Sequence, residues 1–302
     1  MNDLKKIIAY NKNWNSLFMI VGLLSTLVGF FLLTALMIDL YMDGSERLSY
    51  KFLTSFPSRF PEEAGILSAW VGSFLILLVT VFAAIPIGIA AGIYLEEYAR
   101  KNWLTDLIEL NIVNLAGVPS IVYGLLAVGM FVQILKLGES ILTGGLTLGL
   151  LILPMVIMAT RESIRAIPTM IREASYATGA TKWQTVRYHI LPYSTGGILT
   201  GVIIGLSRAI GETAPIITVG ALTFIAFLPT PPTSSDFPYL SFKWLMDPFT
   251  VVPIQMFNWV SRPQQAFQVN AAAAGIVLMV MTLLMNGLAI YIRYRFRKRI
   301  KW

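Results

Sequence analysis

The stretch RESIRAIPTMIREASYATGATKWQTVRYHILP, residues 161–192, decides how this chain is organised. It is a polar island between two apolar runs, residues 141–160 and 196–208, and it holds five of the chain's 23 Lys and Arg residues. The island is long enough for two short helices. A structured basic loop between membrane-like segments predicts a docking surface for another protein, and it favours a protein driven from the cytoplasmic side over a simple pore.

The composition is that of a membrane protein. Of 302 residues, 56% are hydrophobic and 13% are charged, whereas soluble domains carry about 25% charged residues. The mean hydropathy is +0.70. Cys is absent and there is one His, which excludes a disulfide scaffold, thiol catalysis and a metal site built from Cys or clustered His. The positive residues behind the net charge of +7 lie beside apolar runs, so we interpret them as fixing topology and not as binding nucleic acid.

Six segments are apolar enough to cross the lipid bilayer as helices of about 20 residues. They are residues 17–40, 66–95, 112–135, 141–160, 196–227 and 269–294. The predicted fold is therefore all-α, a polytopic integral membrane protein with six transmembrane helices. The second and fifth segments are longer than one span, and Pro86 and Pro215 are candidate kinks. The first is too long for the ~7–15-residue core of a signal peptide and no cleavage motif follows it, so we expect a retained anchor.

The basic residues predict the orientation. With both termini in the cytoplasm, the cytoplasmic segments carry 16 Lys and Arg residues and the external segments carry six. This places the island at 161–192 in the cytoplasm. We divide the chain into residues 1–65 (cytoplasmic tail, first span and external loop), 66–294 (core) and 295–302 (basic cytoplasmic tail).

A long external loop is predicted at residues 228–268. It carries seven of the 15 prolines, which argues against a regular spanning segment, together with Trp244 and Trp259. Two interpretations stay open. The loop is either an interfacial lid with aromatic anchors, or an ordered surface that covers a pore mouth or meets an external partner.

Small residues recur at four-residue spacing in three predicted spans. The fifth carries Gly197, Gly201 and Gly205, continued by Ala209, and the pairs Gly88/Gly92 and Gly145/Gly149 repeat the pattern in the second and fourth. Such stripes allow helix backbones to approach closely in lipid. We expect them mainly to pack helices, and smooth stripes would also allow the sliding that alternating access requires.

Helix signals divide the island into a hairpin. Thr169 can cap a first helix that runs to Thr178, with Gly179 as its left-handed stop. Thr181 can cap a second, in which Gln184 completes a capping box and Pro192 ends the helix. Positive charge from Lys182 and Arg187, with bulk from Trp183 and Tyr188, favours a protein contact over a solvated surface.

The island resembles the cytoplasmic signature of permeases in binding-protein-dependent ABC importers. That signature is Glu-Ala-Ala, a Gly six positions after the Glu, and a Leu-Pro pair whose Pro is thirteen after the Gly. The matching residues are Glu173, Ala174, Ser175, Gly179, Leu191 and Pro192. Ser175 replaces the second Ala, and His189 stands where an apolar residue is usual and could alter packing in the last turn. The resemblance implies that residues 173–192 dock into a cleft of an ATP-binding subunit; the alternative is an ordinary helical hairpin.

The fifth predicted span ends with an Arg and a Glu, in Ser207-Arg208-Ala209-Ile210-Gly211-Glu212-Thr213-Ala214-Pro215. Charges inside a span are costly and mark functional candidates. At a spacing of four residues Arg208 and Glu212 share a helix face and can pair, although Arg-first is the weaker order for helix stability. A guanidinium donates two parallel hydrogen bonds to an oxyanion. We therefore take Arg208, Glu212 and Thr213 as candidate pathway residues; the alternative is a structural ion pair between packed helices.

This segment closely resembles the Arg-x-x-Gly-Glu-Thr-Ala-Pro stretch of phosphate-importer permeases. The likeness covers most of the chain from about residue 66 and continues in these downstream segments: Pro248-Phe249-Thr250, Pro253-Ile254-Gln255, Phe257-Asn258-Trp259 and Ala271-Ala272-Ala273-Ala274-Gly275. The Thr-Ala-Pro and Pro-Ile-Gln segments favour the PstA type over its PstC-type partner. The resemblance implies a type I ABC importer permease (MetI-like) fold in a bacterial inner membrane.

The same resemblance implies partners: a PstC-type second permease, a dimer of ATP-binding subunits and an external phosphate-binding protein, with the loop at 173–192 carrying ATPase motion to the spans. The chain has no Gly-rich Lys-Ser/Thr phosphate loop, so we expect no cofactor and no ATP hydrolysis here, with ATP and magnesium held by the ATPase partner. We expect its contacts outside the complex to be membrane lipid.

Other interpretations stay open. A permease for sulfate, molybdate or another oxyanion would share the architecture, as would the PstC-type subunit. An ATP-independent anion transporter or channel would not need the capped hairpin. A membrane scaffold with no transport role would not need the intramembrane charges of Arg208 and Glu212. The acidic residues at span ends are expected to be solvated; Glu96-Glu97 and Arg100-Lys101 can form i,i+4 pairs on a short helix. Pro119-Ser120 is expected to mark a packing kink in the third span, the alternative being a kink that lines the pathway.

Overall fold

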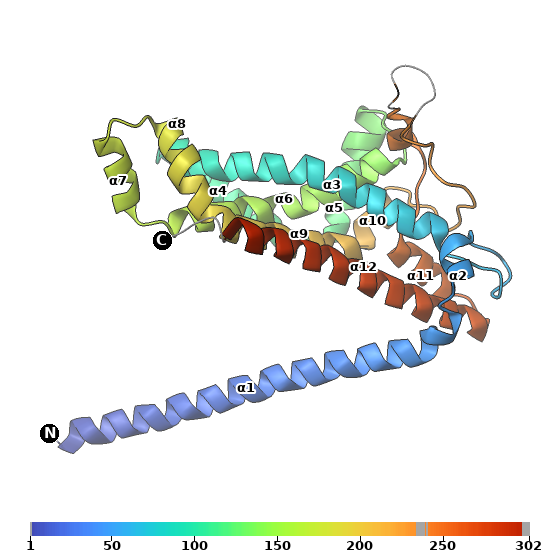
Figure 1. Cartoon of the computed structure of the whole chain (residues 1–302), viewed down its shortest axis with the longest axis horizontal. Helices are drawn as coiled ribbons and strands as arrows, with labels where there is room; N and C mark the ends of the chain where they lie inside the picture. Colours follow the sequence, from blue (N-terminus) through green and yellow to red (C-terminus); the bar gives the residue numbers. More distant parts are fainter. Residues whose placement is uncertain (1, 234–238, 240, 298–302) are drawn as a thin grey trace.

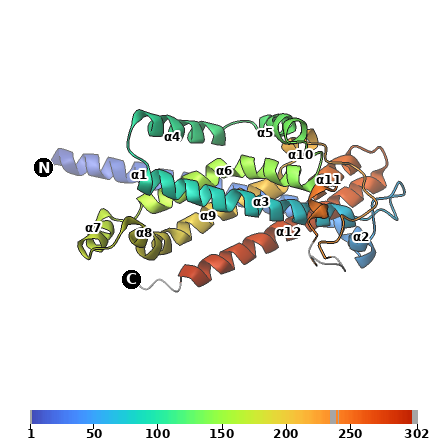
Figure 2. The same ribbon diagram turned by 90° about the horizontal axis from the view of Figure 1, so that it is seen from above.

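The structure is a computed structural model that describes residues 2–233, 239 and 241–297, and every element in these ranges is a helix. Three long helices form its centre: α3 (Leu67–Ile93), α6 (Ile141–Arg165) and α9 (Leu191–Gly211). α6 packs between α3 and α9, and α12 (Gln265–Arg297) packs against α9. On another side of α6 lie α4 (Trp103–Ala116) and α5 (Ser120–Ala127), as Figure 2 shows.

Among the described residues, five helical segments are long and apolar enough to cross a membrane, and there is a sixth if α4 and the helix that begins with α5 count as one bent span. The five are Tyr10–Arg47, Leu67–Tyr98, Ile141–Arg165, Lys182–Gly211 and Gln265–Phe296. The prediction of an all-α, multi-span protein is confirmed. The predicted spans at 17–40 and 269–294 lie within α1 (Asn2–Gly44) and α12.

The predicted third span, 112–135, is wrong as a single segment. The chain bends by 107° between α4 and the helix formed by α5 and a π-helical segment, Val128–Ile134. α4 ends at Gly117, and Pro119, which has no N–H to donate, precedes α5. Pro119 therefore marks a sharp change of direction and not a kink inside one rod.

The fifth predicted span, 196–227, has both boundaries wrong. The helix begins at Lys182 and runs unbroken through Pro192, so Pro192 does not end it. A π-helical turn, Val186–Ile190, lies directly before, and Pro192 stands in the first turn of α9, where a missing N–H is tolerated. At the other end α9 stops at Gly211, and only α10 (Ala214–Thr218) follows before irregular chain.

The glycine stripes pack the three central helices together, as predicted. A Cβ added at Gly201 would meet Ala159 of α6, and one added at Gly197 would meet Ser163. On α3, Gly88 faces Val156 in the same way. α6 thus receives glycine faces from both neighbours. Gly149 packs less closely, because a Cβ added there would lie at ordinary van der Waals distance from its nearest neighbour, Ala83.

Figure 1 shows two ends of the molecule. The hairpin of α7 (Thr169–Ala177) and α8 (Lys182–Thr185) lies at one, toward which the N-terminal end of α1 and the C-terminal end of α12 also point. α2 (Tyr50–Thr54) and α11 (Val252–Val260) lie at the other. α1 runs apart from the bundle until Gly44 meets α12 at Ala272 and Ala273. Of the predicted basic tail, residues 298–302 lie outside the described residues.

The predicted loop at 228–268 contains more regular structure than its prolines suggested. It holds a short 3₁₀ helix, Lys243–Met246, and α11, which has Pro253 in its first turn, the position that proline tolerates best. Trp259 on α11 is fully buried against Phe52, with ring centroids 5.9 Å apart. It is a core residue and not an interfacial anchor, so the lid interpretation fails for this side chain.

Candidate coupling hairpin and intramembrane ion pair

The hairpin between α6 and α9 reverses at Gly179, whose φ of +84° lies in the left-handed region that favours glycine. The first helix, α7, begins at Thr169 but is not capped by it: Pro168 holds the N-cap position and no side chain caps the helix. Pro168 fixes the extended backbone there, which replaces the predicted hydroxyl cap. The Gly179 prediction is confirmed and the Thr169 cap is wrong.

The second helix begins with the predicted capping box. Thr181 Oγ1 accepts from the backbone N–H of Gln184 at 3.3 Å, and the Thr181 N–H donates to Gln184 Oε1 at 2.8 Å. Ser175, the departure from the usual Ala, is buried in α7 with its Oγ 2.9 Å from the buried Thr185 Oγ1 of α8. The departure therefore adds a hydrogen bond that ties the two arms of the hairpin together.

The outer face of the hairpin carries most of the predicted docking residues. Exposed side chains on it are Glu173, Ala174, Lys182, Trp183 and Arg187, with Gly179 exposed at the turn. His189 is exposed and lines an open hollow beside Gly179 and Tyr188, so it does not disturb the packing of the last turn. Leu191 and Pro192 are half-buried instead. This face combines an acid, two bases and an exposed Trp, a composition suited to a protein contact.

The inner face of the hairpin packs on the ends of α3 and α6. An apolar cluster of Ile164, Ile167, Val186 and Ile190, with Leu191 against it, joins the hairpin to the spans. Leu191 therefore packs inward and does not belong to the outer face. Arg172 lies beside this cluster and contacts Glu97, which follows α3 in a π-helical turn, Tyr94–Tyr98.

The carboxylates after α3 pair differently from the prediction. Glu97 is buried and bonds Arg172, while Glu96 pairs with Arg165 at 3.0 Å and lies 3.6 Å from Arg161. Neither makes the predicted pair with Arg100 or Lys101, because Glu96 is paired with arginines of α6 and Glu97 with Arg172 of α7. Arg161 also pairs with Glu109 of α4 at 2.6 Å, with 8% of its side chain exposed. Sequence reasoning missed this network, and the one signal for it was two adjacent acids at a span end facing a loop rich in Arg.

Arg208 and Glu212 pair as predicted, with Nε 3.1 Å from Oε1. They do not share a helix face, however. Arg208 is in the last turn of α9, whereas Glu212 follows the helix in extended backbone, with φ −76° and ψ 126°. Thr213 comes next, half-buried at the N-cap of α10 without a side-chain cap. Both charges belong to one short segment, and Arg208 also contacts Met155 of the neighbouring helix α6.

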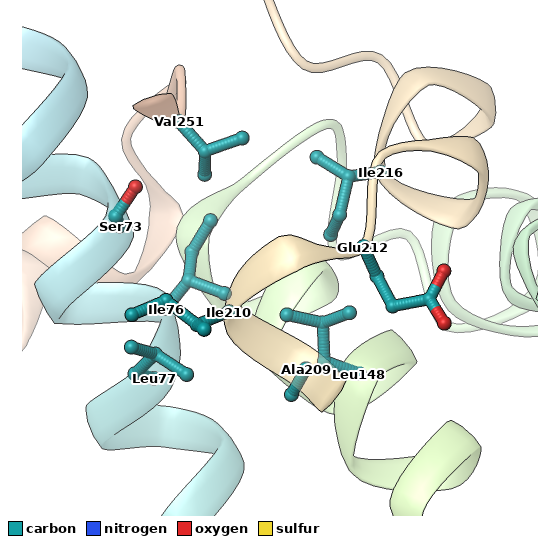
Figure 3. A pocket seen from close by; sticks show the side chains of 9 residues that line it. All are labelled: Ser73, Ile76, Leu77, Leu148, Ala209, Ile210, Glu212, Ile216 and Val251. Carbon is teal, nitrogen blue, oxygen red and sulfur yellow. The ribbon is translucent and has the colours of Figure 1, made fainter. Parts of the chain in front are cut away.

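Glu212 stands at the edge of a small, mostly apolar pocket. Figure 3 shows the Glu212 carboxylate pointing away from Ile76, Leu148 and the other apolar side chains that line the pocket. Arg208 is 36% exposed, and its Nη1 lies 3.7 Å from Met155 Sδ. Nη2 of Arg208 has no hydrogen-bond partner among the described residues. The guanidinium is therefore held at Nε and keeps donors free.

Comparison with known proteins agrees with this architecture. Residues 84–302 match the family described as binding-protein-dependent transport system inner membrane component. The chain is 30% identical over 298 residues to the phosphate transport system permease protein PstA of Yersinia pestis, which covers 96% of this chain and 93% of that protein. It is 34% identical over 196 residues to the probable ABC transporter permease protein YqgI of Bacillus subtilis (strain 168), covering 64% and 67% of the two chains.

A solved structure shares the fold at low sequence identity. A chain of a bacterial alginate ABC transporter, in complex with an alginate pentasaccharide-bound periplasmic protein, superposes with a TM-score of 0.66 at 15% identity. The match covers 93% of this chain and 95% of that one. The predicted fold of a type I ABC importer permease is confirmed. The chain thus belongs to the family of binding-protein-dependent transport system inner membrane components, as a multi-pass permease of an ABC importer.

Proposed function

We propose that this chain is the PstA-type permease of an ATP-driven phosphate importer. In this proposal it forms the pathway together with a second, PstC-type permease and receives phosphate from an external binding protein. A dimer of ATP-binding subunits docks on the exposed face of α7 and α8 and hydrolyses ATP with magnesium, so this chain does no catalysis and needs no cofactor. Both termini lie in the cytoplasm.

The proposal rests on the surroundings of the Arg208 side chain. It is a guanidinium inside a membrane span, partly exposed, anchored through Nε to Glu212 and with Nη2 unoccupied among the described residues. A charge in this position is costly unless it serves a ligand or a pathway. Free guanidinium N–H groups match the oxygens of a tetrahedral anion. Glu212 keeps the guanidinium oriented and weakens its affinity enough for the anion to leave.

The hairpin supports the ATP-driven part of the proposal. Its reversal at Gly179, its capping box and its inner apolar cluster make it rigid, while its outer face exposes Glu173, Lys182 and Trp183. Rigidity and exposure together are what an element needs to transmit the movement of a docked subunit. A channel or a transporter driven by an ion gradient has no use for such an element.

The test is uptake of labelled phosphate into proteoliposomes that contain the whole complex and its binding protein, with ATP inside and sulfate as competitor outside. Uptake that requires ATP and ignores sulfate is expected. ATP-dependent uptake of sulfate instead keeps the importer and overturns the substrate, because a guanidinium accepts either tetrahedral anion. Uptake by this chain alone, without ATP, overturns the coupling role of the hairpin.

A further inference from the structure

The polar contacts between the first arm of the hairpin, α7, and the ends of α3 and α6 come from one arginine. Arg172, on the inner side of α7, donates from Nε and Nη2 to Glu97 Oε1 at 2.9 and 2.8 Å. The same guanidinium donates from Nη1 to the backbone carbonyl of Ile167 at 2.9 Å and from Nη2 to that of Ile164 at 3.0 Å. One side chain of the hairpin thus holds the end of α3 and the end of α6 at once.

These contacts are sheltered from water. The Glu97 side chain is 5% exposed and that of Arg172 is 18% exposed, whereas Arg165 nearby is 54% exposed. Exposed ion pairs contribute little, but a buried pair strongly resists separation because each charge would be left without a partner. The Ile164 carbonyl, in the last turn of α6, also accepts from the backbone N–H of Ile167 at 3.1 Å, and Ile167 lies just beyond that helix. Arg172 therefore adds a side-chain donor to the backbone that ends α6.

The neighbouring carboxylate extends the connection. Glu96 stands beside Glu97 in the same π-helical turn and pairs with Arg161 and Arg165 of α6. Arg161 in turn pairs with Glu109 of α4. α4 leads through the bend at Pro119 to α5, where Gly124 lies directly against Pro215 and Thr218 of α10, a few residues after Glu212. Ion pairs, two stretches of backbone and the contact between α5 and α10 thus link the hairpin to the segment that follows the Arg208–Glu212 pair.

We infer that Arg172 and Glu97 form a positioning pair that makes the spans follow the hairpin, so that ATP hydrolysis is converted into transport. Neither residue touches the transported anion or ATP. Arg172 faces away from the docking surface of Glu173 and Trp183, so its loss leaves the docked subunit in place and loosens the hairpin from α3 and α6. This inference rests on the proposed docking of an ATP-binding subunit on the hairpin.

The test uses the whole complex in proteoliposomes with its binding protein and compares Arg172→Gln with wild type. Three quantities are measured: the ATP-binding subunit retained on purification, the ATP hydrolysis rate, and the uptake of inorganic phosphate. We expect normal retention and continued hydrolysis, with the phosphate taken up per ATP reduced about fivefold or more, the lower end of typical coupling between sites. The matched control is Arg100→Gln, an exposed arginine at the same end, which should leave this ratio unchanged.

Two further variants separate positioning from folding. Arg172→Lys keeps a positive charge beside Glu97 but cannot reach Glu97, Ile164 and Ile167 together. We therefore expect an assembled complex whose ratio lies below that of wild type, which tests the inference also where Arg172→Gln does not assemble. The double variant Arg172→Glu with Glu97→Arg should recover part of the ratio lost in each single variant, which a defect unrelated to the pairing of the two charges would not do.

The outcomes are distinct. A wild-type complex that retains no ATP-binding subunit overturns the proposed function and this inference with it. A coupled wild type together with an unchanged ratio in Arg172→Gln or Arg172→Lys overturns the inference alone. A double variant no better than either single one also counts against it.

Discussion

Gly201 offers a sharp test of the packing between α6 and α9. A Cβ at this position would collide with the Cβ of Ala159, a short side chain that cannot move aside, so the two helices must separate. Gly196, on the same helix, has nothing within 4 Å of an added Cβ. The pair of variants Gly201→Ala and Gly196→Ala therefore differs in one contact and shares the same change in helix propensity.

The magnitude follows from two opposing effects. Replacing Gly by Ala in a helix interior is worth about 1 kcal/mol in propensity. Overpacking a tight contact costs about 1–3 kcal/mol. We therefore expect Gly196→Ala to be about 1 kcal/mol more stable than wild type, and Gly201→Ala to be about 1–3 kcal/mol less stable than Gly196→Ala.

The assay is thermal unfolding of the purified chain in a mild detergent, with both variants measured beside wild type. For chains of 150–250 residues, 1 kcal/mol shifts the melting temperature by about 2–4 °C, and a longer chain falls at or below the low end. A difference of about 2–6 °C between the two variants is expected on that scale. Equal melting temperatures would refute the close approach of α6 and α9 at this glycine.

Three functional substitutions complete the set. Arg208→Gln should abolish phosphate uptake while the complex still assembles, because it removes the charge and keeps the polar bulk; normal uptake would remove Arg208 from the pathway. Gly179→Asp should lose the ATP-binding subunit on purification or hydrolyse ATP without transport. An L-residue is strained at a φ of +84°, and the Asp side chain adds a negative charge to the docking face. Unchanged binding of the subunit would contradict the docking assignment. Glu173→Lys should act in the same direction but more mildly, measured as ATP hydrolysis stimulated by the loaded binding protein, because it alters an exposed contact without straining the backbone.

Local signals predicted local structure well. The left-handed turn at Gly179, the capping box of Thr181 and Gln184, and the pairing of Arg208 with Glu212 each depend on residues a few positions apart. Such interactions are set by backbone geometry and side-chain reach, which a sequence pattern records directly. The glycine stripe at Gly201 was equally readable, because a missing side chain at helical spacing has few uses other than close packing.

Two local predictions were wrong, the Thr169 cap and the helix end at Pro192. The other errors arose where distant residues or the path of the chain decide the structure. Glu97 was expected to pair within its own helix, yet its partner Arg172 lies 75 residues away, and no spacing rule reports that distance. Hydropathy does not report the bend at Pro119, because the residues on both sides of it are apolar. It likewise extended the fifth span beyond Gly211, because the chain after the helix is apolar without being helical. The roles of the site residues stay predictions that the experiments above address.

The continuity of the helix from Lys182 to Gly211 has a mechanical consequence. The π-helical turn lets it pass Pro192 without a break, so the second arm of the hairpin and the span that ends at Arg208 form one stiff lever. At 1.5 Å per residue, Lys182 and Arg208 stand about 39 Å apart along its axis. A tilt of about 5° around the midpoint would carry each end through about 1.7 Å, enough to make or break a hydrogen bond. A small rocking of a docked subunit would thus reach the Arg208 guanidinium with its amplitude undiminished.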